Sequence, residues 1–345
     1  MKSNKLFHTV MKAKNIIYII SLVFAAMSCS MDSDTMMNDT TKEIENSLNN
    51  GEVAVSFSLT DGSVTTKSVT PAAADNTTDQ DINNVTIFLL EGENVIDVKQ
   101  SNVKNQKLYT NCFYVKKGER SSLNLIVVAN SSIGTSFATA NEIRTAVIHL
   151  GDCTKYGESA LSLSGNAYTA TIELIQSYAK VGLASFKVQR AASSGYNNLK
   201  VELTNIALVN QNTKGQVDGL AMVPTATELA NLNVSRNDIV ILNNNTGSSN
   251  ILKDDVVLFN TFAYDYKNTE QKLALALTYE VNGISHTETI TIQGATQGTL
   301  AVAAGNIYKL NVTASITPEG RVTILNVGFE VVDLVKREIT PETFA

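Results

Sequence analysis

The plainest structural signal in the sequence is the stretch LALALTYEVNGISHTETITI, residues 273–292. Apolar residues alternate with small or polar ones on both sides of Asn282-Gly283, which is the pattern of two strands that each bury one face. A two-residue Asn-Gly loop suits a type I′ turn, because both residues tolerate positive φ. That turn fixes a register in which the apolar residues share one face. The predicted pairs are Val281 with Ile284, Leu275 with Ile290 and Leu273 with Ile292.

The same period of two extends through most of the chain. In EVAVSFSLT, residues 52–60, apolar residues alternate with small or polar ones, which predicts a strand with one buried and one wet face. Helical patterns are scarce, and only 141–150 and 226–232 could form short helices. The class is therefore all-β, with two β-sandwiches in tandem as the expected architecture. Further strands are predicted at 84–90, 123–129, 168–175, 180–188, 199–208 and 256–264.

The stretch MKAKNIIYIISLVFAAMSC, residues 11–29, has the pattern of an export signal. Two lysines precede an apolar run over 16–26, and small residues follow directly before Cys29. The apolar run has roughly eleven residues, whereas a membrane-spanning helix needs about 20. The sequence therefore predicts a signal that is removed, with translation starting at Met1 or at Met11.

The cysteine at the end of this signal, Cys29, resembles the lipobox cysteine of bacterial lipoproteins, which is lipidated and becomes the mature N-terminus. The match is imperfect, because Ala26, Met27 and Ser28 stand where Leu-Ala-Gly or Leu-Ser-Gly is typical. Acyl chains such as palmitate contribute about 0.8 kcal/mol per buried methylene, so a multiply acylated cysteine anchors a soluble domain stably. We predict a signal peptide over 1–28, lipidation at Cys29 and a polar tether over 29–50.

Composition limits what the tethered part can be. The chain of 345 residues is long enough for two domains after the signal is removed. Its net charge of −6 comes without a basic stripe, which argues against nucleic acid as a partner. Cys112 and Cys153 cannot form a disulfide framework, so they are two separate thiols or one bridge. We predict an N-terminal sandwich over 51–177, with its first strand and linker reaching to about 83, and a C-terminal sandwich over 178–345.

The sequence lacks the common catalytic motifs. It contains no Gly-x-Ser-x-Gly elbow, Walker loop, Cys-x-x-Cys or His-Glu-x-x-His. The run DNTTDQD, residues 75–81, lacks the glycine and the final glutamate of a calcium loop, so a solvated linker is favoured. His286 falls opposite Tyr279 in the predicted hairpin, which indicates a packed or edge histidine. We expect no enzyme activity, no metal site and no cofactor.

Several short motifs stand in a characteristic order along the chain. After the lipobox cysteine come the strand EVAVSFSLT, a linker with TTKSVTPA, the strand DINNVTIFLLEG and the run LNLIVVANS. The centre holds SYAKVGLASFKV and LKVELTNIALVN, and the end holds GNIYKLNVTASI and GRVTILNVGFEVVDL. This order resembles the fimbrillin family, the major fimbrial subunits of type V pili in Gram-negative anaerobes. The resemblance covers essentially the whole mature chain and rests on order and spacing, because each motif alone is degenerate.

The resemblance implies sandwiches of the transthyretin-like, Greek-key type and a specific assembly chemistry. Family precursors reach the outer membrane as lipoproteins, and a trypsin-like protease cuts the linker after the first strand. Loss of that strand opens an apolar groove, which a C-terminal strand of another subunit fills by strand addition. In this sequence the implied cut lies between Lys67 and Ser68. The displaced strand would carry Val53, Val55, Phe57 and Leu59, and a donor strand near 321–333 would carry Leu325, Val327, Phe329 and Val331.

Two features leave alternatives open. The C-terminal segment fits equally well as the last strand of the C-terminal sandwich. The linker residue is Lys67 where the family typically has arginine, and no arginine occurs between Cys29 and Arg120. A strictly arginine-specific protease could not process this chain, whereas a protease of trypsin's broader specificity accepts either cation. The alternative is an anchor or accessory subunit that is retained by its lipid.

A second class of function also stays open, a glycan-binding surface lipoprotein. Such a protein needs flat aromatic platforms for sugar faces, and the best candidates are Tyr264 and Tyr266, because the chain has no tryptophan. We favour the structural subunit, located in the outer membrane as a lipid-anchored precursor and then in the fimbrium. Its predicted partners are other copies of itself, accessory fimbrial subunits and a trypsin-like maturation protease, and its surface receptor is not identified by the sequence.

Overall fold

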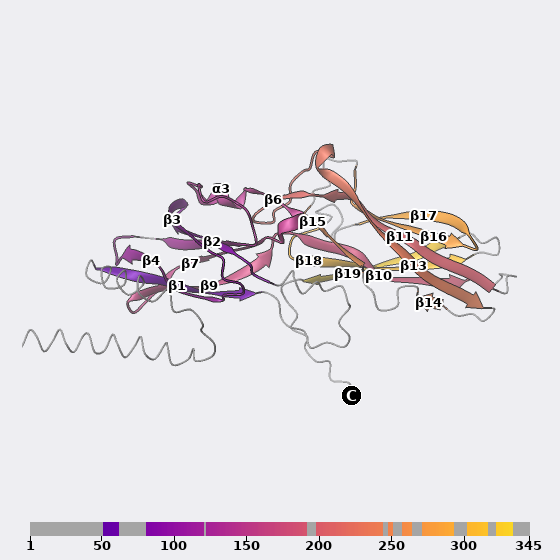
Figure 1. Ribbon diagram of the computed structural model, residues 1–345, viewed down its shortest axis with the longest axis horizontal. Coiled ribbons are helices and arrows are strands. Elements are labelled where there is room, and N and C mark those ends of the chain that lie inside the picture. Colours follow the sequence, from indigo (N-terminus) through magenta and orange to yellow (C-terminus); the bar gives the residue numbers. More distant parts are fainter. Residues whose placement is uncertain are drawn as a thin grey trace, which may run out of the picture. The chain divides into compact units, whose positions relative to one another are not determined.

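The computed structural model is built almost entirely from β-strands, which confirms the predicted all-β class (Figure 1). Its described residues are 51–61, 81–120, 122–191, 198–243, 248–250, 257–263, 271–292, 302–316 and 322–333. The described residues from Gly51 onward belong to one compact unit. Within it, the predicted seam between residues 177 and 178 falls between two strands, and the division into two domains there stays a prediction.

The N-terminal half forms an eight-stranded sheet in the order β3-β2-β5-β7-β9-β1-β4, with β8 paired to β9. The sheet curls so that its two edge strands come close to each other. The ammonium of Lys99 in edge strand β3 lies 5.7 Å from the ring centroid of Phe113 in edge strand β4. Apolar side chains from strands at both ends of the order therefore share one core cluster. The strands are β1 (Glu52–Asp61), β2 (Val85–Glu91), β3 (Asn94–Ser101), β4 (Leu108–Lys116), β5 (Leu123–Ala129), β7 (Lys155–Ala160), β8 (Ser162–Ser164) and β9 (Ala167–Gln176).

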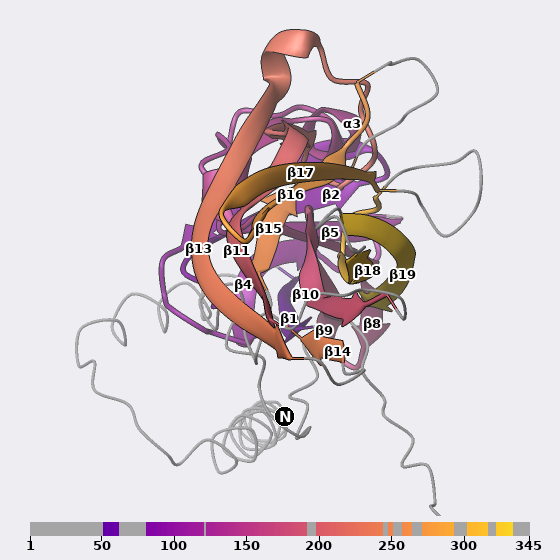
Figure 2. The same ribbon diagram turned by 90° about the vertical axis from the view of Figure 1, so that its right-hand side faces the viewer.

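The C-terminal half contains two further sheets that enclose a second core cluster (Figure 2). One has the order β14-β10-β18-β19, with β15 also paired to β10, and the other has the order β13-β11-β16-β17. Their strands are β10 (Ala179–Arg190), β11 (Asn198–Asn212), β13 (Leu229–Asn243), β14 (Ser248–Asn250), β15 (Val257–Thr261), β16 (Ala274–Val281), β17 (Ile284–Thr291), β18 (Asn306–Ile316) and β19 (Val322–Asp333). All the strands predicted from the sequence are present, with ends that differ by a few residues.

The predicted hairpin is confirmed as β16 and β17. Its turn residues have positive φ, 49° at Asn282 and 84° at Gly283, as a type I′ turn requires. Val281 pairs with Ile284 and Leu275 with Ile290. Ile284 is nevertheless 65% exposed. The register places it on the apolar face of the hairpin, but at the tip this does not bury its side chain.

The two predicted helices are shorter than expected. The first is α3 (Ala140–Arg144), which Thr139 and Glu142 begin with a capping box. The chain then turns extended at β6 (Val147–His149), because β6 pairs with β12 (Lys214–Gln216). The second is a single 3-10 turn at Ala226–Glu228, since β13 pairs with β11 from Leu229 onward. Strand pairing outweighs weak helical propensity in both places.

A third core cluster joins residues of both halves around the β6–β12 ribbon. Phe88 and Ile126 pack there with Tyr178, Val217 and Phe262. A Cβ at Gly215 would lie 2.3 Å from the Phe262 ring, so only glycine fits at this close approach.

Candidate functional site

Strand β1 is a central strand of the N-terminal sheet, although it is separated in sequence from both of its neighbours. It pairs in parallel with β9 and antiparallel with β4. The strands that pair with β1 therefore lie more than forty residues away in sequence, and the residues between Asp61 and Asp81 lie outside the described structure. If β1 were removed, two unpaired strand edges would face each other across an apolar gap.

The inward face of β1 is the apolar face that the alternation in the sequence predicts. Val53, Val55, Phe57 and Leu59 are 6%, 0%, 2% and 3% exposed. The ring of Phe57 stacks on that of Tyr109 in β4, with centroids 4.8 Å apart and planes 4° from parallel. This ring pair fixes the position of Phe57 along β4. The role of these residues as a displaceable strand stays a prediction.

The outward face of β1 meets an irregularity in β4. Val55 pairs with Phe113 and Phe57 with Tyr109, so three residues of β4 stand opposite Ser56 alone. Within this bulge Asn111 has a φ of 52°, a left-handed conformation. Its backbone N–H donates to the hydroxyl of Ser56 at 3.0 Å. A side chain of β1 thus satisfies an amide that the ladder cannot reach.

Residues after the gap in the described chain are held by two left-handed asparagines. The Asn105 side chain accepts a hydrogen bond from the Ile82 N–H (2.8 Å), and the Asn130 side chain accepts one from the Asn83 N–H (2.7 Å). The Asp81 carboxylate accepts hydrogen bonds from Lys104 and Asn105, and these lower its pKa. The start of β2 is therefore fixed independently of β1.

The predicted donor segment forms the edge strand β19. It pairs antiparallel with β18 along its length, with Val312 opposite Val327 and Leu310 opposite Phe329. Val327 is partly buried and packs on the C-terminal core. In this structure the segment is the last strand of its sheet, and its use by another subunit stays a prediction.

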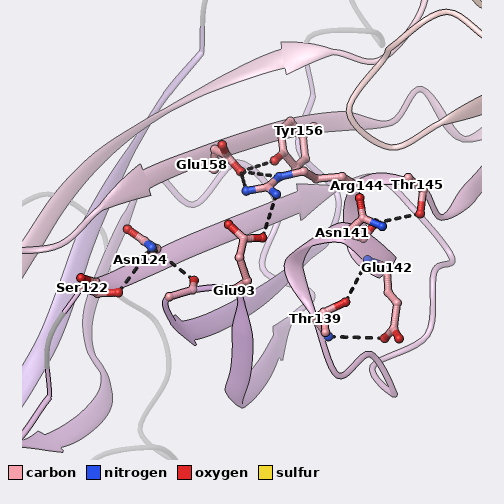
Figure 3. A network of polar contacts seen from close by, with 11 residues as sticks. Glu93, Ser122, Asn124, Thr139, Asn141, Glu142, Arg144, Thr145, Tyr156 and Glu158 are labelled. Atoms are coloured by element: carbon pink, nitrogen blue, oxygen red, sulfur yellow. Dashed lines mark hydrogen bonds and ion pairs between the residues drawn. The ribbon is translucent and has the colours of Figure 1, made fainter.

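A polar network that the sequence did not predict lies beside α3 (Figure 3). Arg144 bonds the Glu93 carboxylate at 3.0 Å and the Glu158 carboxylate at 3.1 Å, and Tyr156 donates to Glu158. Burial lowers the pKa of Arg144, but these hydrogen bonds outweigh it and raise the pKa overall. Burial, followed by the hydrogen bond to Glu158, raises the pKa of Tyr156.

An adjoining cavity of about 240 Å³ is lined by Leu90, Ile126 and Ala140 on its apolar side and by Arg144, Glu158 and Ser159 on its polar side. The network could have been suspected only from charged residues at 93, 144 and 158, which lie far apart in sequence.

The remaining predicted residues do not gather into a site. Cys29, Lys67, Ser68, Tyr264 and Tyr266 lie outside the described residues. Cys112 and Cys153 are separate thiols, and burial raises the pKa of Cys112 to about 11. His286 stands opposite Tyr279 as predicted, with the rings stacked 5.7 Å apart. Among the described residues no group of acidic, histidine and cysteine side chains could hold a metal ion.

No helix within the described part of the chain has both the length and the apolar character needed to cross a membrane.

Comparison with known proteins relates part of the chain to a known family. Residues 53–204 match the family of the major fimbrial subunit protein FimA. The chain is similar to a fimbrilin from Porphyromonas gingivalis W83, at 15% identity over 81% of this chain and 97% of that one, with a TM-score of 0.53. It is also similar to a candidate cell adhesion protein from Parabacteroides distasonis ATCC 8503, at 13% identity over 82% and 96% of the two chains, with a TM-score of 0.54. No curated protein matches the chain. At these identities the two structures establish a shared fold.

Proposed function

Because residues 53–204 match the family of the major fimbrial subunit protein and the chain shares its fold with a fimbrilin, we propose that it is a structural subunit of a cell-surface fimbria and that it polymerises by exchanging β1 for a β19 strand of another copy. The family is one of structural fimbrial subunits, not of enzymes. Strand exchange, lipid anchoring and proteolytic maturation are the parts of this proposal that go beyond the family match.

The observation that carries the proposal is the match between the two strands. When Phe329 is aligned with Phe57, Leu325, Val327 and Val331 fall on Val53, Val55 and Leu59. The ends agree as well, since β1 ends at Asp61 and β19 ends at the aligned Asp333. A β19 strand in the place of β1 would bring one aromatic ring to Tyr109 and an aliphatic side chain to each of the other three buried positions. Occupants that share side-chain periodicity can share one groove.

The energetics favour exchange only after β1 is released. Four buried side chains at about 1.5 to 3 kcal/mol each hold the occupant of the groove. While β1 is tethered, its effective concentration is high, so a partner strand cannot compete. A cut in the linker removes this advantage and lets β1 diffuse away.

Lys67 is the proposed site of that cut. It is the only cation between Asp61 and Asp81, among small and polar residues without an apolar period. Such a segment suits a protease cleft. Delivery would depend on lipidation of Cys29, which is lost together with β1. If the cut does not occur, the chain would serve instead as an anchor subunit retained by its lipid.

Limited trypsin treatment of the purified precursor tests the proposal. We expect a chain that begins at Ser68 and a ladder of oligomers that resists denaturant, and we expect Lys67→Ala to block both. A trypsin-treated chain that starts at Ser68 but stays monomeric at high concentration contradicts the exchange mechanism. Fibres from cells whose subunits begin at lipidated Cys29 would replace the stalk role with the anchor role.

A further inference from the structure

We infer that the groove of β1 selects its occupant by a hydroxyl side chain at one position, the residue directly before the buried aromatic. This inference rests on the proposed strand exchange and adds a specificity element to it. The position is that of Ser56, one residue before Phe57. The residue type at this position therefore predicts which strands complete the N-terminal sheet best.

The selecting group is the backbone amide of Asn111. Because β4 has two more residues than β1 between the pairs Val55–Phe113 and Phe57–Tyr109, the backbone of β1 cannot reach every amide of the bulge. The left-handed turn at Asn111 directs its N–H toward β1, where Ser56 Oγ accepts it at 3.0 Å. Both residues are only half-exposed, so this hydrogen bond is not simply exchanged for one with bulk water.

The register of any occupant is fixed independently of this hydrogen bond. Phe57 is the only aromatic residue of β1, and it stacks on Tyr109. An occupant with one aromatic residue will place its ring there, and its preceding residue will then face Asn111. Serine or threonine at that place supplies the acceptor, whereas glycine or alanine leaves the amide without one.

The chain's own β19 lacks the acceptor. Phe329 is the only aromatic residue of β19, and the residue before it is Gly328. In the aligned register β19 therefore matches the four buried positions of β1. It offers no hydroxyl to the Asn111 N–H. The groove should bind β1 more tightly than β19. Its best partner is the donor strand of a subunit that carries serine or threonine directly before the aromatic residue.

The test measures how fast the strand leaves the groove. After trypsin cuts at Lys67, the peptide that contains β1 is held without a covalent tether, and its release is followed by size-exclusion chromatography and mass spectrometry. Ser56→Ala should release the peptide roughly three- to tenfold faster than the wild type, the effect of one net hydrogen bond. Ser56→Thr keeps the hydroxyl and should restore the slow rate. Ser58→Ala is the matched control, because Ser58 lies on the same face and its hydroxyl donates to the exposed Thr171 hydroxyl, at 3.3 Å, and not to β4.

A second arm uses β19 itself. In oligomers formed after cleavage, Gly328→Ser should slow dissociation in denaturant by a similar factor, whereas Glu330→Ser, which aligns with Ser58, should not. Equal release of the wild-type and Ser56→Ala peptides overturns the inference whether or not oligomers form. Failure of the wild type to form oligomers overturns the proposed exchange instead, while the peptide arm still decides whether the groove prefers a hydroxyl.

Discussion

Strands β1 and β19 carry nearly the same pattern of apolar residues but occupy different places in their sheets. β1 has a hydrogen-bonded neighbour on each side, β9 and β4. Among the described strands β19 has one neighbour, β18, and lies at the edge of its sheet. A strand held on one side is easier to detach than a strand held on both. In the proposed exchange, a similar side-chain pattern therefore serves both a strand that leaves only after cleavage and a donor strand at the edge of its sheet.

The largest expected effect comes from removing β19. A chain ended at Ile316, the last residue of β18, should remain a soluble, folded monomer and should form no oligomers after trypsin treatment, because the donor strand is gone. Circular dichroism and size-exclusion chromatography with the intact chain in parallel check this. Aggregation or loss of strand signal would assign β19 to the permanent core and remove the distinction between the two strands.

The next effect is on β1. Phe57→Ala in the Lys67→Ala background should lower the free energy of unfolding by about 3 to 5 kcal/mol, because the ring is 2% exposed and stacked on Tyr109. Urea denaturation measures it. Ser58→Ala, on the outward face of the same strand, should stay within about 0.5 kcal/mol of the parent. A midpoint that does not move in Phe57→Ala would mean that β1 is not part of the core.

A smaller effect is expected for a substitution in β19. Val327 is only partly buried, so Val327→Ala should cost about 1 to 2 kcal/mol in the same assay. Ile284→Ala, at a residue 65% exposed, is the control and should be close to neutral. If Val327→Ala destabilised the protein as much as Phe57→Ala, β19 would be bound to its sheet as firmly as β1 and would not be the strand that detaches more easily.

The smallest effect concerns the segment just before β2, which is held independently of β1. Lys104 and Asn105 lower the pKa of Asp81, so the stabilisation is present above the unfolded pKa and is lost as pH falls through the folded pKa. Asp81→Asn should therefore reduce the difference in melting temperature between pH 7 and strongly acidic pH. An unchanged difference would show that the contact does not contribute to stability.

Much of the fold could be predicted because local patterns agreed with tertiary pairing. The hairpin turn at Asn282-Gly283 and the alternation of β1 each depend on residues that are close together in the sequence, so both can be recognised from the sequence alone. The register of β4 could not be predicted, since the bulge at Asn111 interrupts the alternation of this strand. The bulge can be recognised only from the pairing of β4 with β1 around Ser56. The Arg144 network joins three separate segments and has no local signature. The resemblance to fimbrillins is confirmed by the family match, whereas the roles of Cys29 and Lys67 stay predictions.

A disulfide trap can show whether β19 of one copy takes the place of β1 in another. Ala54 of β1 pairs with Tyr114 of β4, and Asn326 is the aligned residue of β19. In a background with Cys112 and Cys153 replaced by serine, Ala54→Cys with Tyr114→Cys should close a disulfide inside the precursor, which shows that the site permits the bond.

The trap itself is Tyr114→Cys combined with Asn326→Cys in the same background. We expect disulfide-linked oligomers of this variant only after trypsin treatment, seen as a ladder on a non-reducing gel. Persistence of monomer after cleavage, with the control disulfide formed, would contradict it.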